Sequence, residues 1–290
     1  MLRCLAFVVV ASALCAAQEP GEYRVERAGA GFHFLEGPVW SKDGHLIFSD
    51  IPTNRIHRFT PGTGMEILRQ DSGGANGNAL DDRGRLVTCE GARRRVVRSN
   101  SKGGTDVLAD KFEGKRLNAP NDVVVRKDGH IFFTDPAFGK DDDVKELSFY
   151  GVFHISPKGE LTAIARWPKR PNGIALSPNG RILYVTASDE RLVRAYDLDR
   201  QGAATNERVL ITGIKGVPDG IRTDEKGNLY IACKGVAIYS PEGQLLRTLE
   251  ISENPSNLAF GDPDLKTLYV TARTTLYRVR LEVKGSVQIE

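Results

Sequence analysis

The sequence has few cysteines and no motif that pairs them. Of its four cysteines, two fall within the first 17 residues, which leaves Cys89 and Cys233. Neither has a CxxC neighbour or a nearby histidine, so the sequence does not indicate a zinc site or a catalytic thiol. In the six-membered ring argued below, the two would lie in opposite units, and their Cα atoms would exceed the roughly 7 Å limit of a disulfide. We therefore expect two buried free thiols.

A basic stripe interleaved with aromatic residues is also missing. The 40 lysines and arginines nearly balance the 37 aspartates and glutamates, and this balance gives no support for a nucleic-acid partner. The nearest basic cluster is Arg93–Arg95, which fits a solvated hairpin turn, with an anion-binding patch as the alternative. Beyond the first residues no apolar run is long enough to cross a membrane.

The N-terminus has the pattern of a secretory signal peptide over residues 1–17. Arg3 supplies the positive charge, and the apolar stretch that follows is too short for a bilayer. Small residues then precede a cleavage site before Gln18. We expect a periplasmic or secreted mature chain without a membrane partner. Lipidation at Cys15 is the alternative, although the preceding Leu14 is bulkier than the residue expected there.

Helical periodicity is absent, whereas strand signals recur along the whole chain. Short apolar runs each follow a tight turn rich in Asp, Asn and Gly, and each is followed by further strands. The result is four short strands in every 40–50 residues. The second strands of these groups are expected at residues 45–49, 85–88, 130–134, 182–186, 228–232 and 267–271.

One short phrase begins each group, and its first residue is called the head here. The heads are Glu36, Asn76, Asn121, Asn172, Asp219 and Ser256. Four strands at this spacing are typical of a propeller blade. The sequence therefore predicts an all-β, six-bladed β-propeller over residues 18–290.

The sixth copy of the repeat lacks its last strand. The segment 23–27 ahead of the first copy can supply it, which would close the ring and complete the last blade. Two β-sandwich domains would explain the strands but not the unbroken repeat. Residues 111–120 and 138–149 interrupt the rhythm and are expected to form surface loops. The acidic run at 141–143 fits a solvated loop, because its spacing does not match a calcium loop.

The heads carry the chemistry, because all six side chains bear oxygen. The first strand of a propeller blade lines the central channel, so residues at its start converge at one mouth. Two carboxylates among these donors suit a hard divalent cation such as Ca²⁺, Mg²⁺ or Mn²⁺, without excluding Zn²⁺. Asn76 and Ser256 fit turn-forming roles equally well. Glu36 does not, because glutamate is a poor turn former.

Several phrases, in order along roughly residues 22–281, resemble the SMP-30/gluconolactonase/LRE family, and more closely its bacterial gluconolactonase branch. They are LEGPVW at 35–40, FSDI at 48–51, EGKRLNAPND at 113–122, FTDP at 133–136, RPNG at 170–173 and PDG at 218–220. The resemblance implies one divalent metal in the channel mouth, with Ca²⁺ the first candidate.

The resemblance also implies roles for particular residues. Family metal ligands match Glu36, Asn172 and Asp219, and Asn121 matches a position that binds metal or substrate. Some members carry a sugar-binding arginine two residues before that asparagine, where this chain has Ala119. Sugar recognition must then come from elsewhere, and the remaining candidates are Asn76, Lys115, Arg116 and His33.

The implied reaction is hydrolysis of a sugar lactone to the open-chain aldonic acid. A metal would polarise the lactone carbonyl, and Asp219 is the expected general base for the attacking water. A serine-hydrolase route is not supported, because the chain has no G-x-S-x-G elbow and no histidine at a head.

Two alternatives remain open from the sequence. One is a metal-dependent phosphotriesterase or aryl-ester lactonase of similar architecture. The other is a non-catalytic propeller that binds a glycan or a protein. The sequence carries no signal for the oligomeric state.

Overall fold

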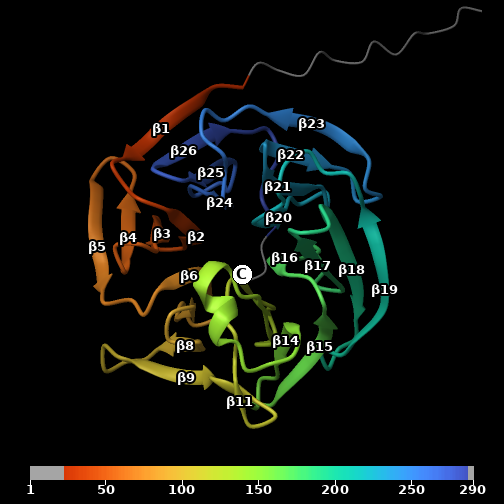
Figure 1. Cartoon of the computed structure of the whole chain (residues 1–290). Helices are drawn as coiled ribbons and strands as arrows, with labels where there is room; N and C mark the ends of the chain where they lie inside the picture. The colour runs from red at the N-terminus through yellow and green to blue at the C-terminus, as the bar shows by residue number, and fades with distance from the viewer. Residues whose placement is uncertain (1–22, 287–290) are drawn as a thin grey trace, which may run out of the picture.

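The computed structural model describes residues 23–286, which form a ring of six four-stranded antiparallel sheets around a central channel (Figure 1). This confirms the all-β, six-bladed propeller. In this part of the chain no helix is long and apolar enough to span a membrane. The signal peptide and Cys15 lie outside the described residues, so export stays a prediction.

Each of the first five blades runs from its innermost to its outermost strand in chain order. Blade one comprises β2 (Leu35–Ser41), β3 (His45–Asp50), β4 (Arg55–Thr60) and β5 (Gly64–Gln70); blade two comprises β6 (Ala75–Leu80), β7 (Leu86–Glu90), β8 (Arg95–Ser99) and β9 (Thr105–Ala109). Blade three comprises β12 (Val123–Val125), β13 (Ile131–Asp135), β14 (Tyr150–Ile155) and β15 (Leu161–Trp167). Blade four comprises β16 (Pro171–Leu176), β17 (Ile182–Ala187), β18 (Leu192–Leu198) and β19 (Ala204–Ile211); blade five comprises β20 (Ile221–Thr223), β21 (Leu229–Cys233), β22 (Gly235–Tyr239) and β23 (Leu245–Leu249).

The sixth blade joins the two ends of the described chain. It contains β24 (Asn257–Gly261), β25 (Thr267–Ala272) and β26 (Thr275–Arg280), and its outermost strand is β1 (Val25–Ala30). β1 pairs antiparallel with β26, starting from Val25 opposite Val279. The predicted closing strand is thus confirmed, a few residues further along the chain. Because the closure pairs the edge of β26, opening the ring requires separating β1.

The two interruptions of the repeat are more ordered than simple loops. Residues 111–120 contain a short hairpin of β10 (Lys111–Phe112) and β11 (Lys115–Arg116). Residues 138–149 contain η1 (Gly139–Val144), a 3₁₀ helix without buried residues. The acidic run 141–143 lies in η1 and is exposed, as expected.

The arginine cluster is a correction to the expected solvated turn. Arg95 Nε lies 2.7 Å from Glu90 Oε2, and Arg93 Nη1 lies 3.7 Å from the same oxygen. Arg69, from blade one, binds the other oxygen of this carboxylate at 2.5 Å. Glu90 is fully buried, so the arginines neutralise an internal charge and join blades one and two.

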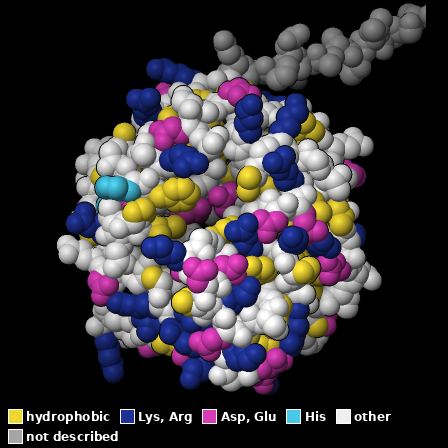
Figure 2. Space-filling model, in the orientation of Figure 1, with side chains coloured by type: hydrophobic (Ala, Val, Ile, Leu, Met, Phe, Trp, Pro, Cys, Tyr) yellow, Lys and Arg dark blue, Asp and Glu magenta, His cyan; other side chains and the backbone are white. Residues whose placement is uncertain are grey.

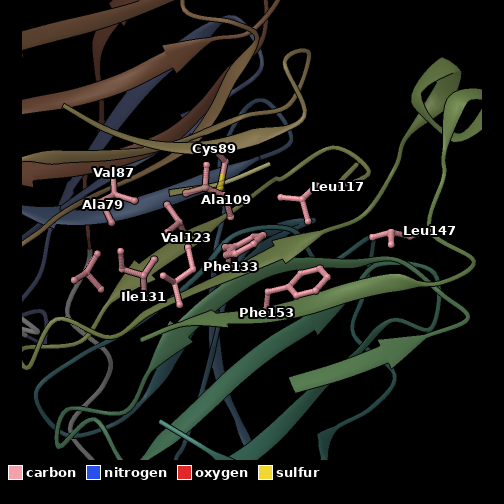
Figure 3. Packing of buried hydrophobic residues seen from close by; sticks show 13 residues of the cluster. Ala79, Val87, Cys89, Ala109, Leu117, Val123, Ile131, Phe133, Leu147 and Phe153 are labelled. Carbon is pink, nitrogen blue, oxygen red and sulfur yellow. The ribbon is translucent and has the colours of Figure 1, made fainter. Parts of the chain in front are cut away.

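Apolar side chains fill the spaces between neighbouring blades. Between blades two and three, Val87 and Cys89 pack with Val123, Phe133 and Phe153 (Figure 3). Each large, fully buried side chain contributes about 1.5–3 kcal/mol through its removal from water. Cys89 and Cys233 are both buried and free, which confirms the thiol prediction.

The inner strands approach one another so closely that side chains are excluded just after four of the six heads. A Cβ added to Gly37 would lie 2.0 Å from the carbonyl oxygen of Asn76, and one added to Gly173 would lie 2.3 Å from that of Asp219. Hydroxyl groups on the second strands fill the remaining gaps. Ser49, Thr134 and Thr186 donate hydrogen bonds to the carbonyl oxygens of Asn76, Asn172 and Asp219 in the next blade. The position of a head is therefore set by the blade before it.

Replacing Thr186 by valine should lower the free energy of unfolding by about 2–4 kcal/mol. The Thr186 hydroxyl donates to Asp219 O at 2.8 Å and accepts from Gly173 N at 2.7 Å. Valine has the same shape but leaves both buried groups unpaired. Urea unfolding followed by circular dichroism measures the change. Thr205→Val on the exposed face of β19 is the control and should change stability by less than about 0.5 kcal/mol. Equal effects of the two substitutions would contradict this account of the inner ring.

Candidate active site

The six heads lie at the starts of the six inner strands, as the repeat predicts. Three of them lie in β2, β6 and β16, and the other three lie one or two residues before β12, β20 and β24. Figure 2 shows the face of the molecule that Figure 1 shows, with acidic side chains inside the depression at the centre of the ring. The heads nevertheless differ in what they contact.

Glu36 is 3% exposed, and its carboxylate is held by two donors. Its Oε2 accepts hydrogen bonds from Gly37 N at 3.0 Å and from Asn257 Nδ2 at 3.1 Å. Burial, and after it the charge of Asp122, raises the pKa of Glu36 from 4.5 to about 7. The fold thus fixes the orientation of this carboxylate without fully compensating its charge.

Asp219 is partly exposed and feels the same charges. Burial raises the pKa of Asp219 well above its usual range, and the charges of Glu36 and then Asp122 raise it further. Glu36 therefore lies near enough to Asp219 for its charge to act on the ionisation of Asp219. Glu36 and Asp219 therefore form one acidic site.

Asn172 presents an unpaired oxygen to its surroundings. Its Nδ2 donates to Ser188 Oγ at 3.0 Å, and that hydroxyl donates its own proton to Pro218 O at 2.9 Å. Ser188 must therefore accept from the Asn172 amide, so the orientation of the amide is determined. Asn172 Oδ1 is left buried, without a hydrogen-bond partner in the described part of the chain. Such an orphaned acceptor costs about 1–3 kcal/mol, and a cation would satisfy it.

The remaining heads divide into candidate ligands and a structural residue. Asn121 is buried, with its backbone bound to Thr134 O at 2.8 Å and to Gly77 N at 2.7 Å. Asn76 Oδ1 is buried and has no hydrogen-bond partner among residues 23–286. The Ser256 hydroxyl, in contrast, donates to Leu35 O in blade one. Ser256 therefore joins the last blade to the first, which is a structural role other than the expected turn.

Of the expected sugar-binding residues, Asn76 is itself a head, whereas Lys115 and Arg116 do not lie in the ring of heads. Lys115 and Arg116 are exposed in β11, which Figure 1 shows near the outer edge of the ring. Arg116 Nη2 donates to Arg93 O at 2.9 Å. The His33 side chain is 64% exposed, and its Nδ1 lies 3.6 Å from Asp50 Oδ2. His33 precedes β2 and is thus closer in the chain to Glu36 than the two cations are.

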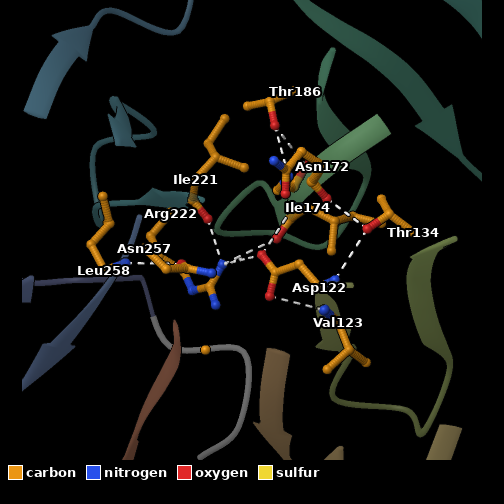
Figure 4. A network of polar contacts seen from close by, with 12 residues as sticks. Asp122, Val123, Thr134, Asn172, Ile174, Thr186, Ile221, Arg222, Asn257 and Leu258 are labelled. Carbon is orange, nitrogen blue, oxygen red and sulfur yellow. Dashed lines mark hydrogen bonds and ion pairs between the residues drawn. The ribbon is translucent and has the colours of Figure 1, made fainter. Parts of the chain in front are cut away.

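Asp122, Asn257 and Arg222 belong to the site, although sequence reasoning did not select them. Asp122 and Asn257 follow the heads of blades three and six, where the other four blades have glycine. Asp122 is fully buried, and its carboxylate accepts from Val123 N, Ile174 N and Arg222 Nη1 at 3.0–3.2 Å (Figure 4). The departure from glycine was the signal that could have identified both residues.

These residues fit a hard cation held mainly by oxygen. Within residues 23–286 no cluster of three or more His, Cys, Asp or Glu side chains could hold a metal. An ion at the heads would therefore bind two carboxylates, from Glu36 and Asp219, together with amide oxygens. The unpaired Asn172 Oδ1 and the effect of the Glu36 charge on Asp219 both favour such an ion.

A separate cavity of about 860 Å³ occupies the other end of the channel. It is lined by the far ends of the inner strands, including Trp40, Leu176 and Phe260, and Arg222 forms part of its wall. None of the six heads lines it. The acidic site and this cavity are therefore different parts of the channel.

Comparisons with known proteins cover most of the chain. Residues 34–274 match the family described as the SMP-30/Gluconolactonase/LRE-like region. A gluconolactonase from Zymomonas mobilis is 34% identical over 295 residues, with 90% of this chain and 82% of the relative covered. The solved structure of a gluconolactonase from Xanthomonas campestris is 31% identical with a TM-score of 0.83, and 90% of each chain is covered.

More distant matches carry other names. A diisopropyl-fluorophosphatase from Loligo vulgaris is 25% identical over 267 residues, with 81% of this chain and 84% of the relative covered. A regucalcin from Agrobacterium tumefaciens, described as a calcium-binding protein, shares the fold with a TM-score of 0.78 at 20% identity over 92% of this chain and 96% of its own. The family match spans all six heads, from Glu36 to Ser256. This chain belongs to the SMP-30/gluconolactonase/LRE-like family.

Proposed function

We propose that this protein hydrolyses sugar lactones to open-chain aldonic acids with the help of one divalent cation held at the heads of the repeat. The observation that carries the proposal is the position of two carboxylates, Glu36 and Asp219, at the heads of the repeat together with the buried, unpaired Asn172 Oδ1. The gluconolactonase relatives support a lactone as the substrate.

Glu36, Asn172 and Asp219 would hold the ion, with Asn121 as a fourth ligand or a contact to substrate. A bound divalent cation supplies Lewis acidity that polarises the lactone carbonyl. Ca²⁺ is the first candidate because the donors are carboxylate and amide oxygens; Mg²⁺, Mn²⁺ and Zn²⁺ also accept such ligands.

The two acids have different surroundings, which separates their roles. Glu36 is buried and fixed by Gly37 and Asn257, so it suits a permanent ligand. Asp219 is partly exposed to solvent. We assign Asp219 as the general base that takes a proton from the attacking water. The water oxygen then bonds to the carbonyl carbon, and the bond from that carbon to the ring oxygen breaks. The ring oxygen leaves as an alkoxide, which takes up the proton held by Asp219 and becomes the hydroxyl group of the aldonic acid.

Hydrolysis of phosphotriesters is the second candidate. The fluorophosphatase relative supports it, and a polarised P=O group requires similar chemistry. The higher identity of the gluconolactonase favours the lactone. Assays on both substrate classes with the same preparation separate these candidates.

Asp219→Asn and Glu36→Gln should each lower lactone hydrolysis by at least about 100-fold, because each removes a charge that acts at the reacting carbonyl. The measurement is proton release from D-glucono-1,5-lactone in a pH-stat, corrected for spontaneous opening, with circular dichroism to check folding. Glu66→Gln, on exposed β5, is the matched control and should retain activity. Chelation should abolish activity, and Ca²⁺ should restore it. Wild-type protein that is loaded with metal but no faster than the spontaneous reaction would contradict the proposal.

Ser188→Ala should weaken Ca²⁺ binding about tenfold, which is the usual scale for a residue that orients a metal ligand. Without the hydroxyl, the Asn172 amide loses the acceptor that fixes its orientation. Isothermal titration calorimetry measures the dissociation constant. Ser156→Ala, in the turn between β14 and β15, is the control and should bind as the wild type does. Unchanged affinity in Ser188→Ala would mean that other contacts orient the amide.

In the metal-free protein, the free energy of unfolding should fall as the pH rises from about 4.5 to 7. The pKa of Glu36 is raised to about 7 in the folded state, so over this range the folded chain keeps a proton that the unfolded chain has released. Stability attributable to this proton is complete below the unfolded pKa and is lost as the pH passes the folded one. The share of Glu36 is at most about 3 kcal/mol.

Chemical denaturation at several pH values, in wild type and in Glu36→Gln, measures this share. The substitution should flatten the decline, because glutamine cannot titrate. Parallel pH profiles for the two proteins would show that Glu36 keeps an ordinary pKa. Addition of Ca²⁺ should restore wild-type stability at pH 7.

A further inference from the structure

Arg222 breaks the inner-strand repeat at a position where every other blade has a small apolar residue. It stands three residues after the head Asp219. The equivalent residues in the other blades are Val39, Ala79, Val124, Ala175 and Ala259. A long cationic side chain at this position is not required to close the ring, because the other five blades have a small apolar residue there.

The guanidinium extends from blade five to blades four and three. Arg222 Nη1 donates to Ile221 O at 2.6 Å, to Ile174 O at 3.3 Å and to Asp122 Oδ2 at 3.2 Å (Figure 4). Asp122 is engaged on both oxygens, because Oδ1 accepts from Val123 N at 3.0 Å and Oδ2 also accepts from Ile174 N at 3.2 Å. Its carboxylate is thus committed to protein donors.

The charges near the heads do not balance within the protein. Glu36, Asp122 and Asp219 can each carry a negative charge, and each of the first two influences the third. Arg222 is paired with Asp122 and also acts on Glu36. When all three acids are ionised, which a bound cation would favour, the group with Arg222 counted has a net charge of about −2, and this is the charge that one divalent ion neutralises. Without Arg222 the net charge of the same group would be about −3.

We propose that Arg222 is a fixed internal cation that withdraws Asp122 from coordination and limits the acidic site to a single divalent ion. The inference rests on the proposed metal centre and adds to it a residue that determines its stoichiometry. Arg222 also lines the cavity at the far end of the channel. A shorter or neutral side chain there would give solvent and a second cation access to Asp122. Arg222 and Asp122 are positioning residues, because neither is needed as a ligand.

The charge argument predicts opposite effects for the two partners. Asp122→Asn leaves the guanidinium uncompensated beside the site and should weaken Ca²⁺ binding by about tenfold. Arg222→Met leaves the Asp122 carboxylate uncompensated and should tighten binding by a similar factor or admit a second ion. The double substitution Asp122→Asn/Arg222→Met should return to one ion with near wild-type affinity. A merely structural ion pair would instead weaken binding in both single variants.

Isothermal titration calorimetry with CaCl₂ at low ionic strength measures the affinities, and elemental analysis after equilibrium dialysis counts the ions per chain. Circular dichroism confirms that each variant is folded. Arg222→Lys is the matched control, since it keeps the charge and should keep one ion. The expected result is one ion in the wild type, with opposite shifts in the two single variants.

Each other outcome counts against the inference. Weaker or unchanged binding in both single variants overturns the role of Arg222 but leaves the metal centre intact. Two ions in the wild type also overturn it. A wild type that binds no divalent ion removes the proposed function as well. If Arg222→Met does not fold, the comparison of Asp122→Asn with the double variant still decides, because only the charge argument predicts that the second substitution restores affinity.

Discussion

The approach of each inner strand to the next is the constraint on which the rest of the structure depends. At Gly37 and Gly173 the neighbouring backbone comes so near that no Cβ can be accommodated. Hydroxyls such as that of Thr186 then bind the carbonyl oxygen of the following head. Because this hydrogen bond is made to a backbone oxygen, it fixes the position of the head residue but does not depend on the identity of its side chain. A ring built in this way can place different oxygen donors at equivalent positions without changing its geometry.

The same tight packing makes it unfavourable for carboxylates at the centre of the ring to ionise. Burial raises the pKa of both Glu36 and Asp219, the charge of Asp122 raises both further, and the charge of Glu36 also raises the pKa of Asp219. A folded chain that holds two such carboxylates and an orphaned amide oxygen is less stable than one with an apolar channel. The proposed cation would offset this cost, because it would satisfy all three groups together. Under the proposed function, stability and activity would therefore depend on the same bound ion.

The fold could be predicted from the sequence because its signals are local and repeated. The runs ending in Ser49, Thr134 and Thr186 gave the second strands, and the same hydroxyls turned out to bind the next head. The free state of Cys89 and Cys233 followed from the ring itself. The order of Lys111–Arg116 and of Gly139–Val144 could not be predicted in this way, because these insertions occur once and depend on contacts with neighbouring loops.

Side-chain roles were less predictable than side-chain positions. The repeat placed Ser256 in the ring, but only its hydrogen bond to Leu35 O shows that it serves closure. Lys115 and Arg116 were reasonable sugar ligands by charge, yet the hairpin holds them away from the heads. Arg222 was not identified as a site residue, because a single cation in a strand does not indicate a function by itself. Its partner Asp122 lies 100 residues away in the chain, and only the fold brings the two together.

Departures from the repeat are informative for a physical reason. Six equivalent positions experience nearly the same packing, so packing alone would favour the same residue at each. Where one blade differs, as Asp122 differs from four glycines and Arg222 from five small apolar residues, something other than packing must stabilise the exception. Here the two exceptions form an ion pair between blades three and five and lie beside the acidic site. The ring can therefore keep six nearly equivalent blades and still hold charged residues in only some of them, because the two charged exceptions compensate each other.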